Sequence, residues 1–103
     1  MNWVLSTHPD VGDDVFEAID YYMSIDPDLA FRFVAEAEAA FAFARQYPRA
    51  GRTLYTKYRR VALGRFPYLV CYRIVGSVVR ALAVVHVRRD PKWVEAKLSS
   101  RAP

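Results

Sequence analysis

The sequence predicts an α+β fold in which two helices pack on one face of a mainly antiparallel sheet. Apolar residues recur at helical spacing in the first half of the chain and at every second position in the second half. The length of 103 residues, of which 53% are hydrophobic, suits one small domain with its own core. We expect this domain over residues 1–98 and a loose C-terminal tail over residues 99–103.

The first half of the chain is expected to form a strand followed by a helical hairpin. Trp3, Val4 and Leu5 form a short apolar run that predicts a strand over residues 2–6. A helix is predicted to follow Pro9 and to stop near Ser24. Asp26 can then cap a second helix that begins at Pro27 and continues to about residue 46.

The second half is expected to form a three-stranded antiparallel meander and a short C-terminal helix. The strands are predicted over residues 57–63, 66–75 and 78–87, joined at Gly64-Arg65 and Gly76-Ser77. Glycine comes first in both joints, as a two-residue type II′ turn requires. Asp90-Pro91 can begin the last helix. The first strand would protect an edge of the sheet by pairing beside the last strand.

Counting back from a turn at Gly76-Ser77 places Arg73 opposite Arg80 and Cys71 opposite Leu82, and sorts the side chains onto two faces. The face expected to lie under the helices is apolar: Phe66, Tyr68, Val70, Tyr72, Ile74, Val79, Ala81, Ala83, Val85 and Val87. The face expected to remain open mixes apolar and basic residues: Arg60, Ala62, Leu69, Cys71, Arg73, Arg80, Leu82, Val84, His86 and Arg88. A mixed open face predicts a binding surface.

The charge distribution predicts an anionic partner. The net charge is +4, and from Arg45 to Arg89 the chain carries eleven Arg or Lys residues and no acid. Such a segment suits nucleic acid or an acidic protein, while the alternative is a solvated basic surface. The candidates for binding nucleic acid or another target are Lys57, Arg59, Arg60, Arg80 and Arg89.

His86 is the strongest candidate for acid-base chemistry, because neighbouring arginines would favour its neutral form. The alternative is a structural histidine at a strand end. Cys71 is the single cysteine, and no Cys/His cluster has zinc spacing, so we expect no disulfide, metal or other cofactor. The sequence shows neither a signal peptide nor an apolar segment long enough for a bilayer, so we expect a cytoplasmic protein without a membrane partner.

In this order, the elements and several local motifs resemble the RelE/ParE superfamily of bacterial toxins over nearly the whole chain. The motifs are Arg59-Arg60, Arg65-Phe66-Pro67-Tyr68, Tyr72-Arg73 and His86-Val87-Arg88-Arg89-Asp90-Pro91. The first half is similar to the ParE-like, plasmid-stabilisation branch, in residues 18–22, 27–33, 47–48 and 51–52.

The resemblance implies the toxin of a type II toxin-antitoxin pair, neutralised by a small antitoxin with an acidic, amphipathic segment. ParE-like members poison DNA gyrase without nucleolytic chemistry, whereas RelE-like members cut messenger RNA on the ribosome. We favour the ParE-like activity, because the chain lacks the dense lysines of the nucleases and has Trp93 where several of them use a C-terminal Tyr. An inactive module that only binds an antitoxin is a further alternative.

The resemblance also implies roles for named residues. If the chain is a nuclease, His86 would act as base or acid, and Arg65, Arg73 and Arg88 would stabilise the transition state. The antitoxin would bind the open sheet face, whose residues for this role are Arg60, Leu69, Arg73, Arg80, Leu82 and Val84. Operator DNA would be reached only through the antitoxin complex.

Overall fold

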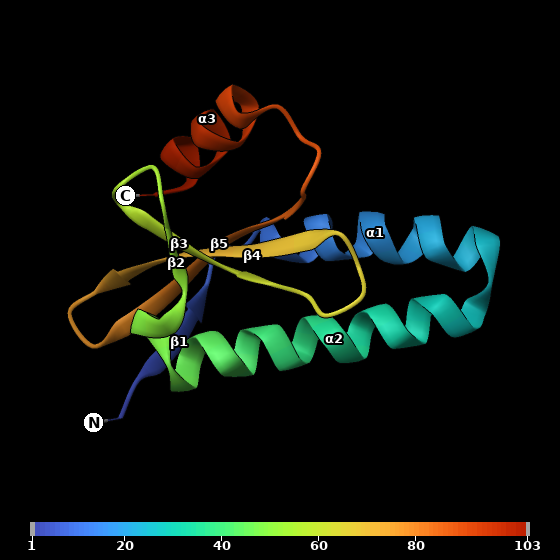
Figure 1. The fold of residues 1–103 in the computed structure, drawn as a ribbon, viewed down its shortest axis with the longest axis horizontal. Coiled ribbons are helices and arrows are strands. Elements are labelled where there is room, and N and C mark those ends of the chain that lie inside the picture. Colours follow the sequence, from blue (N-terminus) through green and yellow to red (C-terminus); the bar gives the residue numbers. More distant parts are fainter. Residues whose placement is uncertain (1, 103) are drawn as a thin grey trace.

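A five-stranded sheet is the centre of the computed structural model, which describes residues 2–102 (Figure 1). Its strands are β1 (Val4–Thr7), β2 (Arg52–Leu54), β3 (Tyr58–Ala62), β4 (Tyr68–Val75) and β5 (Val78–His86). The order across the sheet is β1-β5-β4-β3-β2, with β1 parallel to β5 and the other pairs antiparallel. The first strand lies beside the last, the position in which it protects an edge of the sheet. The meander has a fourth strand, β2, which is too short to show alternation in the sequence.

The predicted helical hairpin consists of α1 (Val11–Ile25) and α2 (Pro27–Gln46). The Asp26 side chain accepts a hydrogen bond from the backbone N–H of Asp28 at 3.0 Å, and Pro27 opens α2, as predicted. A short 3-10 helix, η1 (Pro48–Ala50), follows α2. Within the described range, none of the helices combines the length and the apolar character that crossing a membrane requires.

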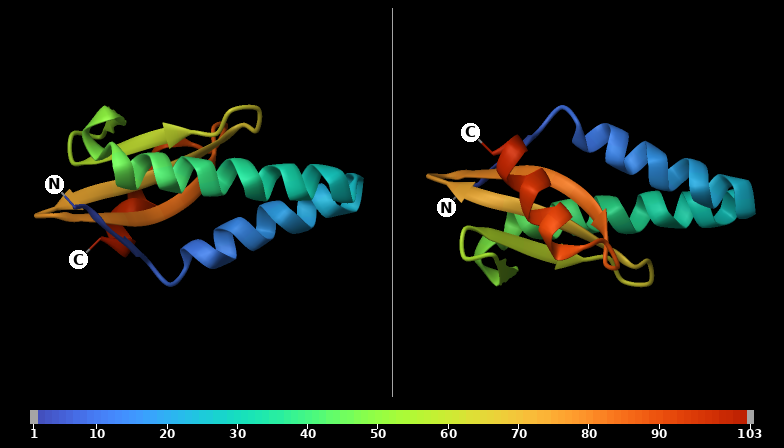
Figure 2. Two further views of the ribbon diagram at one scale, coloured as in Figure 1. Left: turned by 90° about the horizontal axis from the view of Figure 1, so that it is seen from below. Right: turned by 90° about the horizontal axis from the view of Figure 1, so that it is seen from above.

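The hairpin and the C-terminal helix α3 (Pro91–Arg101) lie on opposite faces of the sheet (Figure 2). We call these faces the hairpin face and the α3 face. The prediction of an open second face is therefore wrong over much of its area. The buried side of α3 consists of Val94 and Leu98, one helical turn apart, which is too short a pattern to recognise in the sequence.

Aromatic rings fill the space between the hairpin and the sheet. Phe33 of α2 is fully buried, and its ring centroid lies 5.2 Å from that of Tyr68 and 5.4 Å from that of Phe66. The Tyr22 ring of α1 lies 4.8 Å from Phe66. The rest of the buried side of α2 is made of alanines, which allow the helix to approach the sheet closely: Ala30, Ala37, Ala40 and Ala44.

A bulge in β5 changes the predicted faces of its second half. The predicted pairs Arg73-Arg80 and Tyr72-Ala81 are confirmed, but Cys71 pairs with Ala83, which leaves Leu82 as an extra residue. Because one added residue reverses the alternation, Ala83 and Val85 pack on the α3 face and Val84 on the hairpin face. His86 pairs with Tyr68 and so shares the hairpin face too, against prediction.

The two glycine-containing joints differ. Gly76 has a φ of +59°, as a type II′ turn requires of its first residue. At the other joint, residues 63–67 form a longer loop in place of the predicted two-residue turn. Glu36 of α2 accepts hydrogen bonds there from the backbone N–H groups of Arg65 at 2.7 Å and Phe66 at 3.4 Å. This side chain substitutes for the missing turn hydrogen bonds.

The end of α3 runs into the segment for which a loose tail is expected. The helix continues to Arg101, whose side chain is only 11% exposed. Pro103, the last residue of the expected tail, and Met1, the first residue of the expected domain, lie outside the described residues.

Candidate functional site

A pocket of about 390 Å³ lies between α1, the end of β5 and α3. We call it the His86 pocket. Its polar and aromatic lining consists of Asp14, Glu17, Tyr21, Tyr68, His86, Arg88, Arg89, Trp93 and Lys97. The His86 ring stands edge-on to Tyr68, with 5.1 Å between the ring centroids. Burial, followed by the neighbouring Tyr22, raises the pKa of Tyr68.

One nitrogen of His86 is already engaged. Its Nδ1 accepts a hydrogen bond from the backbone N–H of Arg88 at 3.0 Å. In a neutral imidazole one nitrogen accepts and the other carries the proton, so the proton of this ring belongs on Nε2. The neutral ring can therefore donate a hydrogen bond from Nε2, but it offers no free basic nitrogen.

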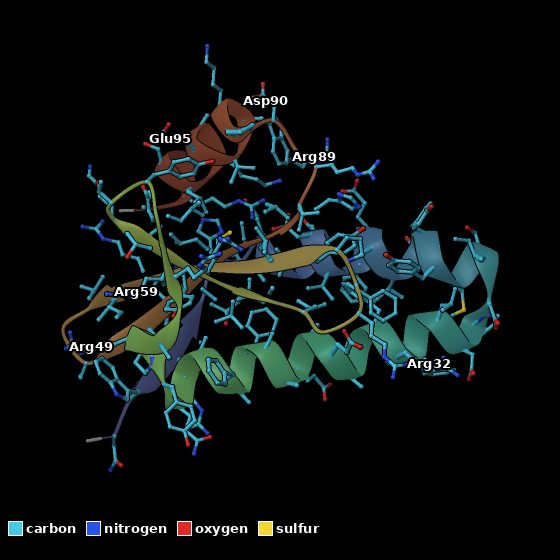
Figure 3. The ribbon with its side chains drawn as sticks, in the orientation of Figure 1. Arg32, Arg49, Arg59, Arg89, Asp90 and Glu95 are labelled. Carbon is cyan, nitrogen blue, oxygen red and sulfur yellow. The ribbon has the colours of Figure 1, made fainter. Side chains whose placement is uncertain are left out.

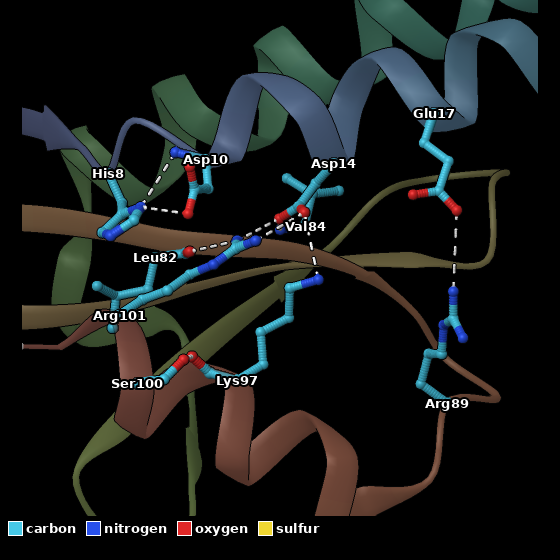
Figure 4. Close-up of polar contacts among 10 residues, drawn as sticks. All are labelled: His8, Asp10, Asp14, Glu17, Leu82, Val84, Arg89, Lys97, Ser100 and Arg101. Atoms are coloured by element: carbon cyan, nitrogen blue, oxygen red, sulfur yellow. Dashed lines mark hydrogen bonds and ion pairs between the residues drawn. The ribbon is translucent and has the colours of Figure 1, made fainter.

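Most of the charges near this pocket are matched (Figures 3 and 4). Arg89 lies 3.9 Å from Glu17 and 4.5 Å from the centre of the Trp93 ring. Lys97 lies 4.4 Å from the same ring and 3.4 Å from Asp14. The pocket thus has both signs of charge, not the concentrated positive field that a phosphate-cleaving site needs.

The four residues predicted for nuclease chemistry do not come together. His86 and Arg88 line one pocket, and Arg65 is exposed in the loop between β3 and β4. Arg73 lies on the α3 face, the other side of the sheet, because it is two residues from the buried Cys71 along β4. It is also five residues from Tyr68, the partner of His86, which corresponds to about 17 Å along the strand.

A row of four arginines crosses the α3 face. Arg52 pairs with Arg60 between β2 and β3, Arg60 pairs with Cys71 of β4, and Arg73, two residues on, pairs with Arg80 of β5. We call these four residues the arginine row. α3 crosses the sheet obliquely and leaves the end of the β4-β5 hairpin uncovered, which is where Arg73 and Arg80 lie (Figure 2). The arginines of the predicted antitoxin surface, Arg60, Arg73 and Arg80, are half-buried and keep part of their surface accessible. Leu82 is buried, and Leu69 packs under α3.

Two other residues predicted to bind nucleic acid have different surroundings. Arg59 pairs with the buried Tyr72, and its guanidinium donates hydrogen bonds to the backbone carbonyls of Arg49 and Gly51 (Figure 3). Both hydrogen bonds come from the same guanidinium nitrogen, and they fix η1 to β3. Lys57 is exposed in the turn between β2 and β3.

An apolar groove of about 560 Å³ lies outside the sheet, between β1, α1 and α2. Its lining is Leu5, Thr7, Val11, Gly12, Val15, Phe16, Glu38, Phe41, Ala42 and Arg45. Phe16 is 64% exposed although it is aromatic. The helical periodicity of α1 predicts Val11 and Val15 as core, but it gives no sign that Phe16 borders a groove.

Sequence reasoning also missed a buried carboxylate. Asp14 has a side chain that is only 7% exposed, and it accepts hydrogen bonds from both terminal nitrogens of Arg101, at 2.7 and 3.1 Å (Figure 4). It also accepts one from the backbone N–H of Val84, and Arg101 donates to the Leu82 carbonyl. The Asp14 cluster, Asp14 with Lys97 and Arg101, thus supplies partners to β5 where β1 has ended. The pairing of residues 87 positions apart leaves no signal in one sequence.

The single cysteine, Cys71, is buried in the sheet. Burial raises the pKa of the Cys71 thiol to about 12, against a lowering effect of Arg60. Residues 2–102 bring together no group of three or more His, Cys, Asp or Glu side chains that could hold a metal ion.

Three comparisons with known proteins find similar proteins of one kind. The family model described as "ParE toxin of type II toxin-antitoxin system, parDE" matches residues 5–91. Toxin ParE2 of Mycobacterium tuberculosis, from strains CDC 1551 and H37Rv, is 37% identical over 98 residues, covering 94% of this chain and 93% of the relative. Among solved structures, a chain of the chromosomal ParDE TA system from P. aeruginosa matches with a TM-score of 0.73 at 18% identity. That match covers 82% of this chain and 96% of the other.

The structural match shows that the α+β fold is shared. The family model covers most of the chain, and the mycobacterial relatives align over nearly their full length. The chain therefore belongs to the ParE toxin family of type II toxin-antitoxin systems.

Proposed function

We propose that this toxin inhibits growth by poisoning DNA gyrase and has no nucleolytic activity of its own. The observation that carries the proposal is the separation of the predicted nuclease residues: His86 and Arg73 lie on opposite faces of the sheet. Phosphodiester cleavage needs a base and stabilising cations around one phosphate. The engaged Nδ1 of His86 further supports a structural histidine.

The proposal is tested in cells induced briefly for the toxin, by measuring trapped gyrase-DNA complexes and ribosome-dependent cuts in messenger RNA. We expect gyrase complexes to accumulate while the messages stay intact. His86→Ala should then leave gyrase trapping within about twofold of the parent. Cuts in messenger RNA that disappear in His86→Ala would instead make the chain a nuclease. The absence of both gyrase complexes and messenger RNA cuts would indicate an inactive antitoxin-binding module.

We also propose that an antitoxin neutralises the toxin by laying an amphipathic helix in the apolar groove. The groove suits this mode of binding, because it is bordered by two helices, exposes Phe16, and is lined by Arg45, which can pair with an acidic residue. On the alternative surface, the α3 face, most of the apolar residues are already covered by α3. Toxin and antitoxin would meet in the cytoplasm.

Phe16→Asp tests the groove, because a charge there would repel an acidic helix and remove an apolar anchor. With the candidate antitoxin encoded beside the toxin co-expressed, we expect Phe16→Asp to remain toxic and to escape neutralisation. Phe31→Asp is the matched control, because Phe31 is 70% exposed on α2 but does not line the groove. Escape by Phe31→Asp with full neutralisation of Phe16→Asp would contradict the proposed surface.

A further inference from the structure

The arginine row is an unusual arrangement within one sheet. Its four side chains come from four adjacent strands and project from one face, and strands in a sheet lie about 4.8 Å apart. Like charges placed directly opposite each other destabilise a sheet, and this row contains two such pairs, Arg52-Arg60 and Arg73-Arg80.

The charges of the row are not compensated within the described protein. Among residues 2–102, no carboxylate lies within 4.0 Å of these guanidinium groups, whereas the ion pairs that do form use Arg32, Arg89, Lys97 and Arg101. Arg80 donates one hydrogen bond to Ser6 Oγ at 2.6 Å, which orients its side chain without neutralising it. The row therefore favours an external anion with several charges.

We propose that the arginine row binds the phosphate backbone of double-stranded DNA. The inference rests on the proposed function in one respect, since it names the DNA held by gyrase as the partner. Guanidinium groups match phosphate oxygens with two hydrogen bonds each. Four of them across adjacent strands form a surface that can follow successive phosphates without reading bases.

The composition of the row favours DNA over an acidic protein. The centre of a protein-protein interface is apolar and poor in charge, whereas protein-DNA interfaces are polar and strongly positive. α3 already covers the apolar residues in the middle of this face, among them Leu82 and Cys71. The exposed apolar residues beside the row are small ones at the end of the β4-β5 hairpin, Val75 and the neighbouring Val4, which offer an amphipathic helix little apolar surface. The apolar groove lies elsewhere, against β1 and the hairpin.

Salt dependence of binding to a fluorescent DNA duplex tests the proposal on the purified toxin. Binding to four phosphates predicts a slope of about −3.6 in log K against log salt, and hence an affinity loss of about 150-fold between 50 and 200 mM salt. The double variant Arg73→Gln/Arg80→Gln should lower the slope to about −1.8, an affinity loss of about 12-fold over the same range.

Arg32→Gln is the control, because it makes the same kind of substitution, with the loss of one positive charge, at an exposed arginine near the tip of the helical hairpin (Figure 3). It should leave the slope unchanged. Thermal melting must show that the double variant is folded, and we expect its melting temperature to be at least that of the parent, since a like-charge pair is removed. Arg73→Lys/Arg80→Lys, which keeps the charges, should retain most of the slope.

Three results would overturn the proposal: no binding to the duplex at 50 mM salt, an equal slope for the parent and the double variant, or displacement of DNA by polyglutamate at a far lower charge concentration than by unlabelled duplex. The last result would assign the row to an acidic protein. If gyrase complexes accumulate in cells but the DNA slope does not depend on the row, this inference fails and the proposed function stands. If the parent toxin does not trap gyrase in cells, the proposed function fails, whatever the DNA-binding measurement shows.

Discussion

The two faces of the sheet are closed in different ways. On the hairpin face, two long helices bury a cluster of aromatic rings around Phe33 and Tyr68. On the α3 face, one short helix covers the middle of the sheet and is tied to α1 by the Asp14 cluster, while the arginine row remains at the margin. Apolar burial is enough to hold the first face, whereas the second depends on ionic contacts and leaves a charged surface for partners.

The largest loss of stability is expected when a buried aromatic side chain is removed from the hairpin face. Phe33 is fully buried and packs against the Tyr22 ring of α1 and the Tyr68 ring of β4, so Phe33→Ala should lower the free energy of unfolding by about 4 kcal/mol. Leu98→Ala, at a fully buried site of the α3 face, should cost about 3 kcal/mol. Urea unfolding of both variants measures the comparison. A larger loss for Leu98→Ala would reverse the order of the two faces.

Removal of the Asp14 carboxylate should affect mainly the α3 face. Asp14→Ala leaves the Arg101 guanidinium and the Val84 N–H without their partner in a half-buried place, at a cost of about 3 kcal/mol. Hydrogen exchange should show faster opening of α3 than of α2. Glu17→Ala is the control, because Glu17 makes only a long, exposed contact with Arg89, and it should cost under about 0.5 kcal/mol. Equal costs would mean that the Asp14 cluster contributes little.

Alkaline pH should weaken the α3 face through Cys71. Its pKa is raised from 9.0 to about 12 in the folded protein. Below pH 9 both states keep the thiol proton, but above it the unfolded state loses the proton first, so stability falls as pH rises toward 12. The thiol's share is about 2 kcal/mol at pH 10.5. The free energies of unfolding of the parent and of Cys71→Ala, measured from pH 7 to 10.5, should approach each other by that amount as the pH rises. A difference between them that does not change with pH would contradict the prediction.

The smallest effect is expected in the turn that leads from β2 to β3. Tyr55 and Thr56 have φ angles of 50° and 61°, and a β-branched residue is strained in that region. Thr56→Gly should therefore raise the free energy of unfolding by about 1 kcal/mol. The hydrogen bond from the Tyr55 hydroxyl to the Pro91 carbonyl at the start of α3 should be unaffected. Thermal melting tests the change, and a lower melting temperature would show that the turn is not strained.

The sequence was sufficient for the elements whose signals are local. The Asp26-Pro27 helix start and the Gly76 turn follow from residue chemistry, and both are confirmed. The faces of β5 were predicted correctly only from Val79 to Leu82, because alternation cannot reveal that Leu82 is an extra residue, after which the faces are reversed. The Asp14-Arg101 and Glu36-Arg65 contacts join distant parts of the chain and were missed for that reason. For the site, the arginines were recognised as a basic surface, but their alignment into one row required the register.

The bulge at Leu82 has a consequence for how this protein can change by mutation. If Leu82 were paired as a regular ladder residue, His86 would lie on the side of α3. If Leu82 were deleted, β5 would alternate regularly and His86 would stay on the hairpin side, opposite Tyr68. The bulge thus lets the strand gain or lose a single residue at this point while the groups displayed on the two sides of the sheet stay the same. Relatives that differ in length at this point are best compared by the side on which a residue lies, since equal position in an alignment does not imply equal surroundings.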